Sequence, residues 1–322
     1  MTGGPAQEGA VPHAPAKPTA HERRVRLREG LAGDALLRFP GAFTPVTAKL
    51  IEGAGFDGAY ISGAVLAAER GLPDIGLTTL TEVVDRGREI QRTTDLPTFI
   101  DADTGFGEPM NVARTISLLE EAGLSACHIE DQVNPKRCGH LDGKSVVERG
   151  EAARRIAAAV AGRQDDAFVV CARTDARAIE GFDAALDRTK AYADAGADLI
   201  FPEALASLEE FEAFASALDV PILANMTEFG KSELFTAQQL TDAGVRMVIY
   251  PVTLLRIALG AIEQGLAQIA QEGTQEALVP HMQTRARLYE VLDYAGYNRF
   301  DDELFQFQIP GVPLSGAPNE EK

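Results

Sequence analysis

Reactive side chains are concentrated in one segment, Glu130-Asp-Gln-Val-Asn-Pro-Lys-Arg-Cys-Gly-His140. The segment follows an apolar run that ends in two carboxylates, and it surrounds a thiol with cationic side chains. A thiol in such surroundings is biased towards the thiolate and can exchange a proton near neutral pH. A solvated surface loop with an inert cysteine is the alternative, and the segment alone does not decide between them.

A second group of candidates consists of carboxylates at the ends of apolar runs. Asp101 and Asp103 are two residues apart, so on a strand both side chains point to the same face. With Glu130 from the next apolar run, they supply the oxygen ligands that Mg²⁺ prefers. Asp103 could instead cap the following turn. Metal binding is favoured because clustered, unpaired carboxylates are costly to bury.

Arginines are the third group. Arg173 interrupts an apolar run, whereas Arg256 and Arg285 lie in helical segments, where a solvated helix face is the simpler interpretation. Arginine binds carboxylates through two parallel hydrogen bonds. Arginines and Mg²⁺ at one site would suit a small, multiply anionic substrate. The net charge of −18, from 48 acidic and 30 basic residues, argues against nucleic acid or an anionic membrane as a partner.

The composition indicates a globular intracellular protein. A chain of 322 residues with 45% hydrophobic residues can bury a large core. Its three cysteines are expected to be reduced thiols in a cytoplasmic protein. Of these, Cys127 and Cys171 are expected to pack in the core, and the neighbouring His128 to hydrogen-bond to another side chain. No apolar stretch reaches the length of a membrane span.

A repeated pattern of helix, Ala-Gly and short apolar strand predicts the fold. Glycine is common just after a helix C-terminus, so each Ala-Gly pair marks a turn from helix into strand. Apolar strands alternating with amphipathic helices indicate a parallel sheet, and eight such units indicate an α/β protein with a (β/α)8 TIM-type barrel. The predicted strands are 38–43, 59–62, 97–103, 126–130, 167–173, 199–203, 220–225 and 247–250, and helices are predicted at 79–93, 111–122, 148–161, 182–195 and 208–218.

The barrel domain is expected to span residues 21–309, between flexible tails at 1–20 and 310–322. Two further helical stretches, 254–270 and 275–294, exceed what one barrel needs. The second carries an apolar stripe, Met282, Leu288, Tyr289 and Leu292, which is expected to pack on another subunit.

Eight sequence blocks resemble the isocitrate lyase and phosphoenolpyruvate mutase superfamily. One of them runs from His128 through His140, and its loop Lys136-Arg-Cys-Gly-His140 is typical of the superfamily's carbon–carbon lyases. The other blocks are Tyr60-Ile-Ser-Gly63, Gly71-Leu-Pro-Asp74, Asp101-Ala-Asp-Thr-Gly-Phe-Gly107, Ala172-Arg-Thr-Asp175, Phe201-Pro-Glu203, Asn225-Met-Thr-Glu-Phe-Gly230 and Met282-Gln-Thr-Arg285. The resemblance implies a Mg²⁺-dependent cleavage of the tricarboxylate 2-methylisocitrate to pyruvate and succinate, in propionate breakdown by the methylcitrate cycle. It also implies a homotetramer with helices swapped between subunits.

The resemblance also implies roles for individual residues. Cys138 would protonate the succinate carbanion, with Tyr60, Lys136 and His140 as further catalytic residues. Asp101 and Asp103 would hold Mg²⁺, partly through waters, with support from Asp74 and Glu130. The implied substrate-binding residues are Ser62, Gly63, Ala64, Cys138, Gly139, Arg173, Glu203, Asn225, Met226, Thr227, Arg256 and Arg285.

Two points of specificity stay open at the level of the sequence. Ala64 stands where many relatives carry glycine, and its methyl group lies beside the implied substrate contacts. Phe201, Ile249 and Pro251 are expected to form an apolar niche for the substrate methyl. The alternatives are lyases or hydrolases that share the cysteine loop and act on 2,3-dimethylmalate, oxaloacetate or a carboxyphosphonate, and, in another class, a barrel that only binds a metabolite.

Overall fold

The computed structural model describes residues 17–306, except 138, 140–142 and 231. The chain forms two compact units, Met1–Ile262 and Glu263–Lys322. The domain expected over residues 21–309 is thus divided after Ile262. Helix α1 begins at Ala20. Residues 1–16 of the expected N-terminal tail and all of the expected C-terminal tail, 310–322, lie outside the described residues, so both tails stay predictions.

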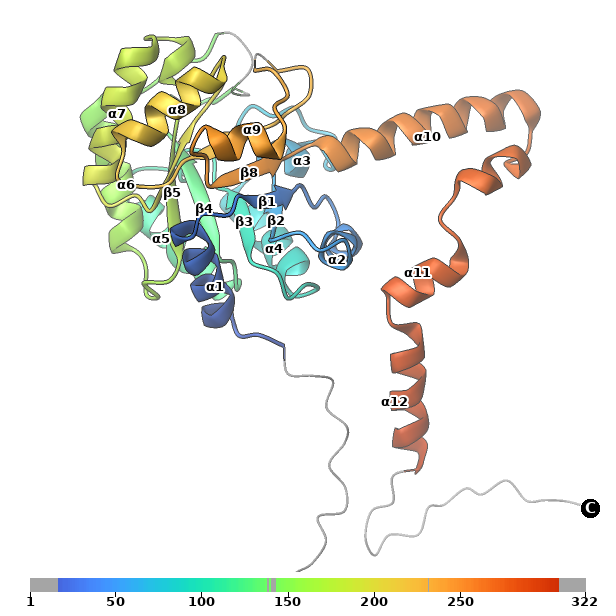
Figure 1. Cartoon of the computed structure of the whole chain (residues 1–322). Coiled ribbons are helices and arrows are strands. Elements are labelled where there is room, and N and C mark those ends of the chain that lie inside the picture. Colours follow the sequence, from blue (N-terminus) through green and yellow to red (C-terminus); the bar gives the residue numbers. More distant parts are fainter. Residues whose placement is uncertain (1–16, 138, 140–142, 231, 307–322) are drawn as a thin grey trace, which may run out of the picture. The chain divides into compact units, whose positions relative to one another are not determined.

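Eight parallel strands form the first unit (Figure 1), as the spacing of the apolar runs predicts. One group of five is ordered β2-β3-β4-β5-β6 and one group of three is ordered β1-β8-β7. Single parallel bridges, Gly41 to Tyr60 and Ile200 to Ile222, join the two groups into a closed ring. The predicted (β/α)8 barrel is therefore confirmed. The strands are β1 (Leu37–Pro40), β2 (Ala59–Ile61), β3 (Thr98–Asp101), β4 (Ala126–Glu130), β5 (Val169–Thr174), β6 (Leu199–Pro202), β7 (Leu223–Asn225) and β8 (Met247–Tyr250).

Helices alternate with the strands, and all five helices predicted between strands are present, with ends shifted by up to two residues. The helices of this unit are α1 (Ala20–Ala32), α2 (Pro45–Gly53), α3 (Gly63–Ala68), α4 (Leu80–Gln91), α5 (Pro109–Glu121), α6 (Arg149–Ala161), α7 (Phe182–Asp194), α8 (Leu208–Ala217) and α9 (Ala237–Asp242), with a 3₁₀ turn at Ala176–Ala178. Helix α1 was not predicted. It begins with a capping box in which Thr19 and Glu22 satisfy each other's backbone N–H groups.

The C-terminal helices differ from the prediction. Helix α10 (Thr253–Glu272) is slightly longer than expected. The single helix expected over 275–294 is wrong: the segment contains a 3₁₀ helix (Glu276–His281) and α11 (Arg285–Val291), and α12 (Tyr294–Gln306) follows. Pro280 explains the break because it has no N–H to continue an α-helix. Thr284 then caps α11 by accepting a hydrogen bond from the Arg287 backbone.

The barrel interior is filled by alternate residues of each strand. One core cluster joins Phe39, Tyr60, Phe99, Phe201 and Ile249 with other strand residues and with Leu27 and Leu31 of α1. A second cluster joins the intervening strand residues, such as Ile100 and Val170, with the surrounding helices. Since side chains alternate along a strand, a residue two positions after an interior residue also faces the interior. The polar side chains at the strand ends have this parity: Asp101, Glu130, Arg173, Glu203 and Asn225.

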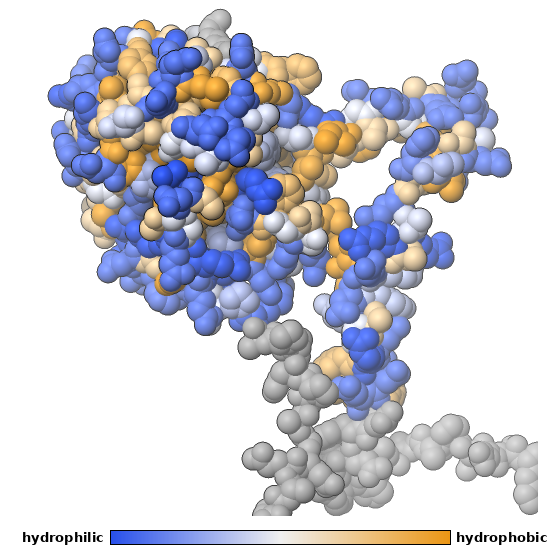
Figure 2. Space-filling view, viewed as in Figure 1, coloured by the Kyte–Doolittle hydropathy of each residue, from blue (hydrophilic) through white to orange (hydrophobic). Residues whose placement is uncertain are grey.

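The visible outer surface of the barrel is largely hydrophilic (Figure 2), in keeping with the high content of acidic residues. None of the described helices is both long and apolar enough to cross a membrane.

Candidate active site

Two aspartates follow strand β3 in a tight, buried arrangement. Asp101 accepts hydrogen bonds from the backbone N–H groups of Asp103, at 2.9 Å, and Gly63, at 3.2 Å. Gly63 has to be glycine here, since an added Cβ would lie 2.7 Å from Asp101 Oδ2. Burial opposes ionisation of Asp101, but the neighbouring His128, Lys136 and Arg173 lower its pKa to about 2. Burial and the charge of Asp101 raise the pKa of Asp103 to about 6. One aspartate is thus firmly ionised, and its neighbour readily takes a proton.

Lys136 joins two of the predicted metal-binding carboxylates. Its ammonium lies 2.7 Å from Asp103 Oδ1 and also contacts Asp74, and its side chain is only 3% exposed. Burial alone would lower the pKa of Lys136, but Asp101, Glu130, Asp103 and Asp74 together raise it above its ordinary value. Lys136 is therefore a charged, paired side chain in this structure and is not poised to act as a base.

The carboxylates meet the chemical requirements of a divalent cation. Within the described part of the chain, no three His, Cys, Asp or Glu side chains are grouped closely enough to hold an ion by themselves. However, both carboxylate oxygens of Glu130 are buried and accept no hydrogen bond from the described residues. Burial raises the pKa of Glu130 well above its usual value. Oε2 of Glu130 is instead paired with the Arg173 guanidinium at 3.3 Å. Carboxylate oxygens such as these suit Mg²⁺, which retains several waters and needs few direct ligands.

A tyrosine and a histidine form a pair inside the barrel, below the aspartates. Tyr60 Oη lies 2.8 Å from His128 Nε2, and the same nitrogen lies 3.6 Å from Asp101 Oδ1. Burial lowers the pKa of His128 to about 4 and raises that of Tyr60 well above its usual value. Both groups are therefore neutral at pH 7, and Tyr60 retains its proton. The bond to Tyr60 confirms the expectation that His128 bonds to a neighbouring side chain.

Arg173 is the centre of the polar site. Its guanidinium contacts Asp175 through Nε at 3.0 Å and Nη2 at 3.2 Å. It also approaches Glu130, at 3.3 Å, and Glu203, at 3.2 Å, and lies 5.2 Å from the centre of the Phe201 ring. Burial alone would lower the pKa of Arg173, but the surrounding carboxylates raise it well above its ordinary value. The site therefore holds a permanent cation that is paired with acidic side chains.

The remaining predicted residues of the barrel unit lie at or after the ends of β2, β6, β7 and β8. Glu203 accepts a hydrogen bond from the Asn225 amide at 3.3 Å. Arg256 donates to the backbone carbonyl of Glu228 at 2.7 Å and to Thr227 Oγ1 at 3.4 Å. Ser62 is buried at the start of α3, and Ala64 is in that helix. The Met226 side chain, in contrast, belongs to the core cluster on the helix side of the sheet.

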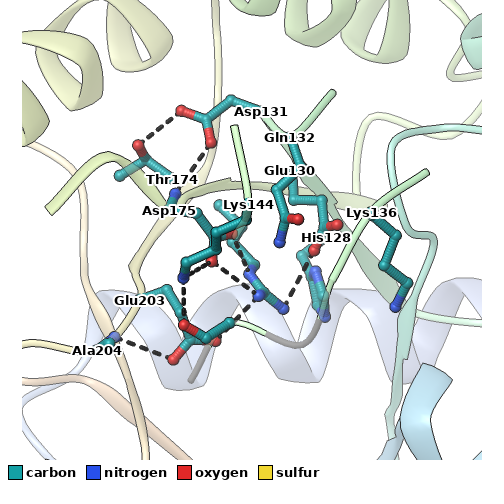
Figure 3. Close-up of polar contacts among 12 residues, drawn as sticks. His128, Glu130, Asp131, Gln132, Lys136, Lys144, Thr174, Asp175, Glu203 and Ala204 are labelled. Carbon is teal, nitrogen blue, oxygen red and sulfur yellow. Dashed lines mark hydrogen bonds and ion pairs between the residues drawn. The ribbon is translucent and has the colours of Figure 1, made fainter. Parts of the chain in front are cut away.

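Three predicted residues cannot be placed at the site. Cys138 and His140 lie outside the described residues. Arg285 begins α11 in the second unit. The structure adds three residues that were not predicted as site residues: the buried Asp131 and Asp175, and Lys144, whose side chain is buried. Lys144 and Asp175 are 2.6 Å apart (Figure 3). Two signals were available in the sequence: Asp131 is the second carboxylate after an apolar run, and Asp175 ends the block Ala172-Arg-Thr-Asp175.

Comparisons with known proteins identify the family of this chain. Residues 27–270 match the phosphoenolpyruvate phosphomutase family. The chain belongs to this family. A Corynebacterium glutamicum member named "Probable 2-methylisocitrate lyase 2" is 62% identical over 286 residues, which cover 89% of this chain and 93% of that protein.

Solved structures of the superfamily have the same fold. A structure of 2,3-dimethylmalate lyase, described as a PEP mutase/isocitrate lyase superfamily member, matches with a TM-score of 0.82 at 34% identity, covering 89% of this chain and 95% of that one. Phosphonopyruvate hydrolase in complex with oxalate and Mg²⁺ matches with a TM-score of 0.80 at 29% identity, covering 88% and 99%. The family was therefore correctly inferred from the sequence blocks.

Proposed function

We propose that this chain is a Mg²⁺-dependent carbon–carbon lyase that cleaves 2-methylisocitrate to pyruvate and succinate. The observation that carries the proposal is the arrangement of a buried guanidinium, Arg173, among carboxylates at the end of the barrel, in a chain 62% identical to a protein named for this substrate. TIM barrels carry their active sites at this end of the strands. Propionate breakdown by the methylcitrate cycle is the corresponding metabolic role.

The chemistry requires cations, a group that takes up the proton of the substrate hydroxyl as the carbonyl of pyruvate forms, and a group that protonates the carbanion. Cleavage next to a carbinol carbon leaves a carbanion beside a carboxylate, and preorganised positive charge stabilises that state. Arg173 supplies a fixed cation and would bind a substrate carboxylate. Tyr60 keeps its proton and can donate a hydrogen bond to an oxygen of the substrate. By its resemblance to the superfamily's lyases, Cys138 would protonate the carbanion.

Mg²⁺ would be held by Asp101 and Asp103, with Asp74 and Glu130 in support. When bound, the ion stabilises negative charge on the oxygens of the nascent pyruvate. Two observations support this assignment: the buried Glu130 carboxylate accepts no hydrogen bond from the described residues, and phosphonopyruvate hydrolase has been solved in complex with oxalate and Mg²⁺. Asp101 is the strongest candidate for a Mg²⁺ ligand, because its carboxylate is buried and yet ionised.

A second candidate is cleavage of 2,3-dimethylmalate. It is supported by the similarity to 2,3-dimethylmalate lyase, whose chain is covered to 95%. Both substrates would place carboxylates against Arg173, so the polar site alone does not separate them. A barrel that merely binds a metabolite is disfavoured because simple binding needs no buried carboxylate pair of unequal acidity.

The decisive experiment is a direct assay. Purified protein with Mg²⁺ is supplied separately with 2-methylisocitrate, isocitrate, 2,3-dimethylmalate and oxaloacetate, and the products are quantified. The proposal requires pyruvate and succinate in equal amounts from 2-methylisocitrate, with the highest kcat/KM of the four. Asp101→Ala is the inactive control. A higher kcat/KM for 2,3-dimethylmalate would select the second candidate, and turnover of none of the four would contradict lyase activity.

We further propose that the protein works as a cytoplasmic homotetramer that uses α10 in assembly. Leu259, Ile262, Leu266 and Ile269 recur on one face of this helix and are 42–62% exposed in the single chain. A symmetric oligomer would cover this face. Light scattering at micromolar concentration measures the subunit number directly, and a monomer would contradict the proposal. The buried free thiols of Cys127 and Cys171 suit a reducing compartment.

A further inference from the structure

One buried charge pair has no role in the chemistry described above. Lys144 Nζ lies 2.6 Å from Asp175 Oδ1, and the two side chains are 2% and 0% exposed (Figure 3). Burying two charges is costly unless their geometry is good and their remaining hydrogen bonds are satisfied. A contribution to stability alone is therefore a weak explanation for this pair. The neighbouring contacts indicate which group the pair positions.

Asp175 is held rigidly from behind. Asp131 accepts hydrogen bonds from the Asp175 backbone at 2.9 Å and the Thr174 hydroxyl at 2.6 Å (Figure 3). The Tyr192 hydroxyl of α7 also donates to Asp131, at 2.8 Å. Because backbone and side-chain contacts converge on Asp131, the position of the Asp175 carboxylate is determined by the barrel framework.

The front of Asp175 determines the orientation of Arg173. Its two oxygens accept hydrogen bonds from Arg173 Nε and Nη2, in addition to the one from Lys144. A guanidinium held through two of its nitrogens cannot rotate freely. Its Nη1 is thereby left facing Glu130, at 3.3 Å.

Lys144 has a second partner, which lies against the same guanidinium. Its ammonium donates to the backbone carbonyl of Gly139. Gly139 packs so closely on the site that an added Cβ would lie 2.5 Å from Arg173 Nη2 and 2.5 Å from Glu203 Cγ. Lys144 therefore contacts two of the groups that lie against the guanidinium: the Asp175 carboxylate and the Gly139 backbone.

We propose that Lys144 is a positioning residue for substrate binding: its ammonium bridges Asp175 and Gly139 and so holds the Arg173 guanidinium in the orientation that binds a substrate carboxylate. The inference rests on the proposed function only in assuming that Arg173 binds a carboxylate. It does not depend on which acid is cleaved.

The test uses oxalate, a small dicarboxylate, titrated calorimetrically into the full-length protein with Mg²⁺. Lys144→Met removes the charge at similar length, and Asp175→Asn removes its partner. Each is expected to weaken oxalate binding at least about tenfold, the size of losing a hydrogen bond to a charged group. The affinity of the double variant for oxalate should be at most about threefold lower than that of the weaker-binding single variant, because the two residues act as a unit. Lys190→Met, at an exposed position of α7, is the matched control and should bind like wild type.

Several outcomes would overturn the proposal. A purely structural role would lower the melting temperature of Lys144→Met while leaving oxalate affinity of the folded protein unchanged. Fully additive effects of the two substitutions would also contradict it, as would a wild-type protein that does not bind oxalate. Should Lys144→Met fail to fold, Lys144→Arg carries the test: it keeps the charge with a different geometry, and wild-type affinity in that variant would refute positioning by the ammonium.

Turnover separates this inference from the proposed function. With 2-methylisocitrate, Lys144→Met should raise KM by at least about tenfold, in line with the loss of a charged contact. If wild type does not cleave 2-methylisocitrate, the proposed function fails, while the oxalate titrations still decide the role of Lys144.

Discussion

Replacing His128 with glutamine should change how the stability of the protein depends on pH. His128 is fully buried among aromatic rings, and burial lowers its pKa from 6.5 to about 4. In the unfolded chain the imidazole takes up a proton below pH 6.5, whereas in the folded chain it stays neutral until about pH 4. Acid therefore favours the unfolded chain, and the stability associated with a neutral His128 is lost as the pH falls from 6.5 towards 4.

The two pKa values determine the size of the effect. Linkage between protonation and folding gives a loss of about 1.4 kcal/mol at pH 5.5 and about 2.5 kcal/mol at pH 4.5, relative to neutral pH. Glutamine does not titrate, and its side-chain amide can still form a hydrogen bond with the Tyr60 hydroxyl. Other groups, such as Asp103 with its raised pKa, are present in both proteins and largely cancel in the comparison.

The assay is urea unfolding of wild type and His128→Gln at pH 7.5, 6.5, 5.5 and 4.5, in the presence of a chelator. At neutral pH the variant is expected to be less stable, because the glutamine fills the barrel less well. The difference in unfolding free energy should then shrink towards low pH by about 2.5 kcal/mol. Parallel curves over this range would refute the conclusion that His128 is neutral in the folded protein.

Three further changes address the reaction. Asp101→Ala should abolish turnover, and ordinary Mg²⁺ concentrations should not restore it. In wild type, a chelator should abolish activity and added Mg²⁺ should restore it. Full activity in excess chelator would contradict a role for the metal. Cys138→Ser raises the pKa of the proposed acid, so kcat should fall at least about 100-fold with little change in substrate affinity. Near-normal turnover would point to another acid, and His140 is the next candidate. Wild type should prefer 2-methylisocitrate over isocitrate by roughly 10- to 200-fold in kcat/KM, the value of a methyl group in an apolar niche. Ile249→Phe should reduce this preference by steric exclusion, and an unchanged preference would place the niche elsewhere.

The fold could be predicted because it depends on periodicities that are local in the sequence. Apolar runs located all eight strands, four of them after an Ala-Gly turn. The alternation of side chains along a strand predicted that Asp101 and Asp103 face one side. The prediction failed at residues 275–294, where Pro280 interrupts what looked like a continuous amphipathic pattern. Helix α1 was missed because its few apolar residues, Leu27 and Leu31, fill the barrel interior and form no regular stripe.

The site was only partly determined by the sequence. Residue types and the resemblance identified Arg173 and the carboxylates as binding groups, since each interrupts or ends an apolar strand. Their protonation states, in contrast, depend on burial and on charges brought together from distant strands. Asp101 and Asp103 are chemically identical and two residues apart, yet the folded barrel lowers one pKa and raises the other. The pairing of Lys144 with Asp175, 31 residues away, likewise exists only in three dimensions, because only the closed barrel brings these two charges into contact away from water.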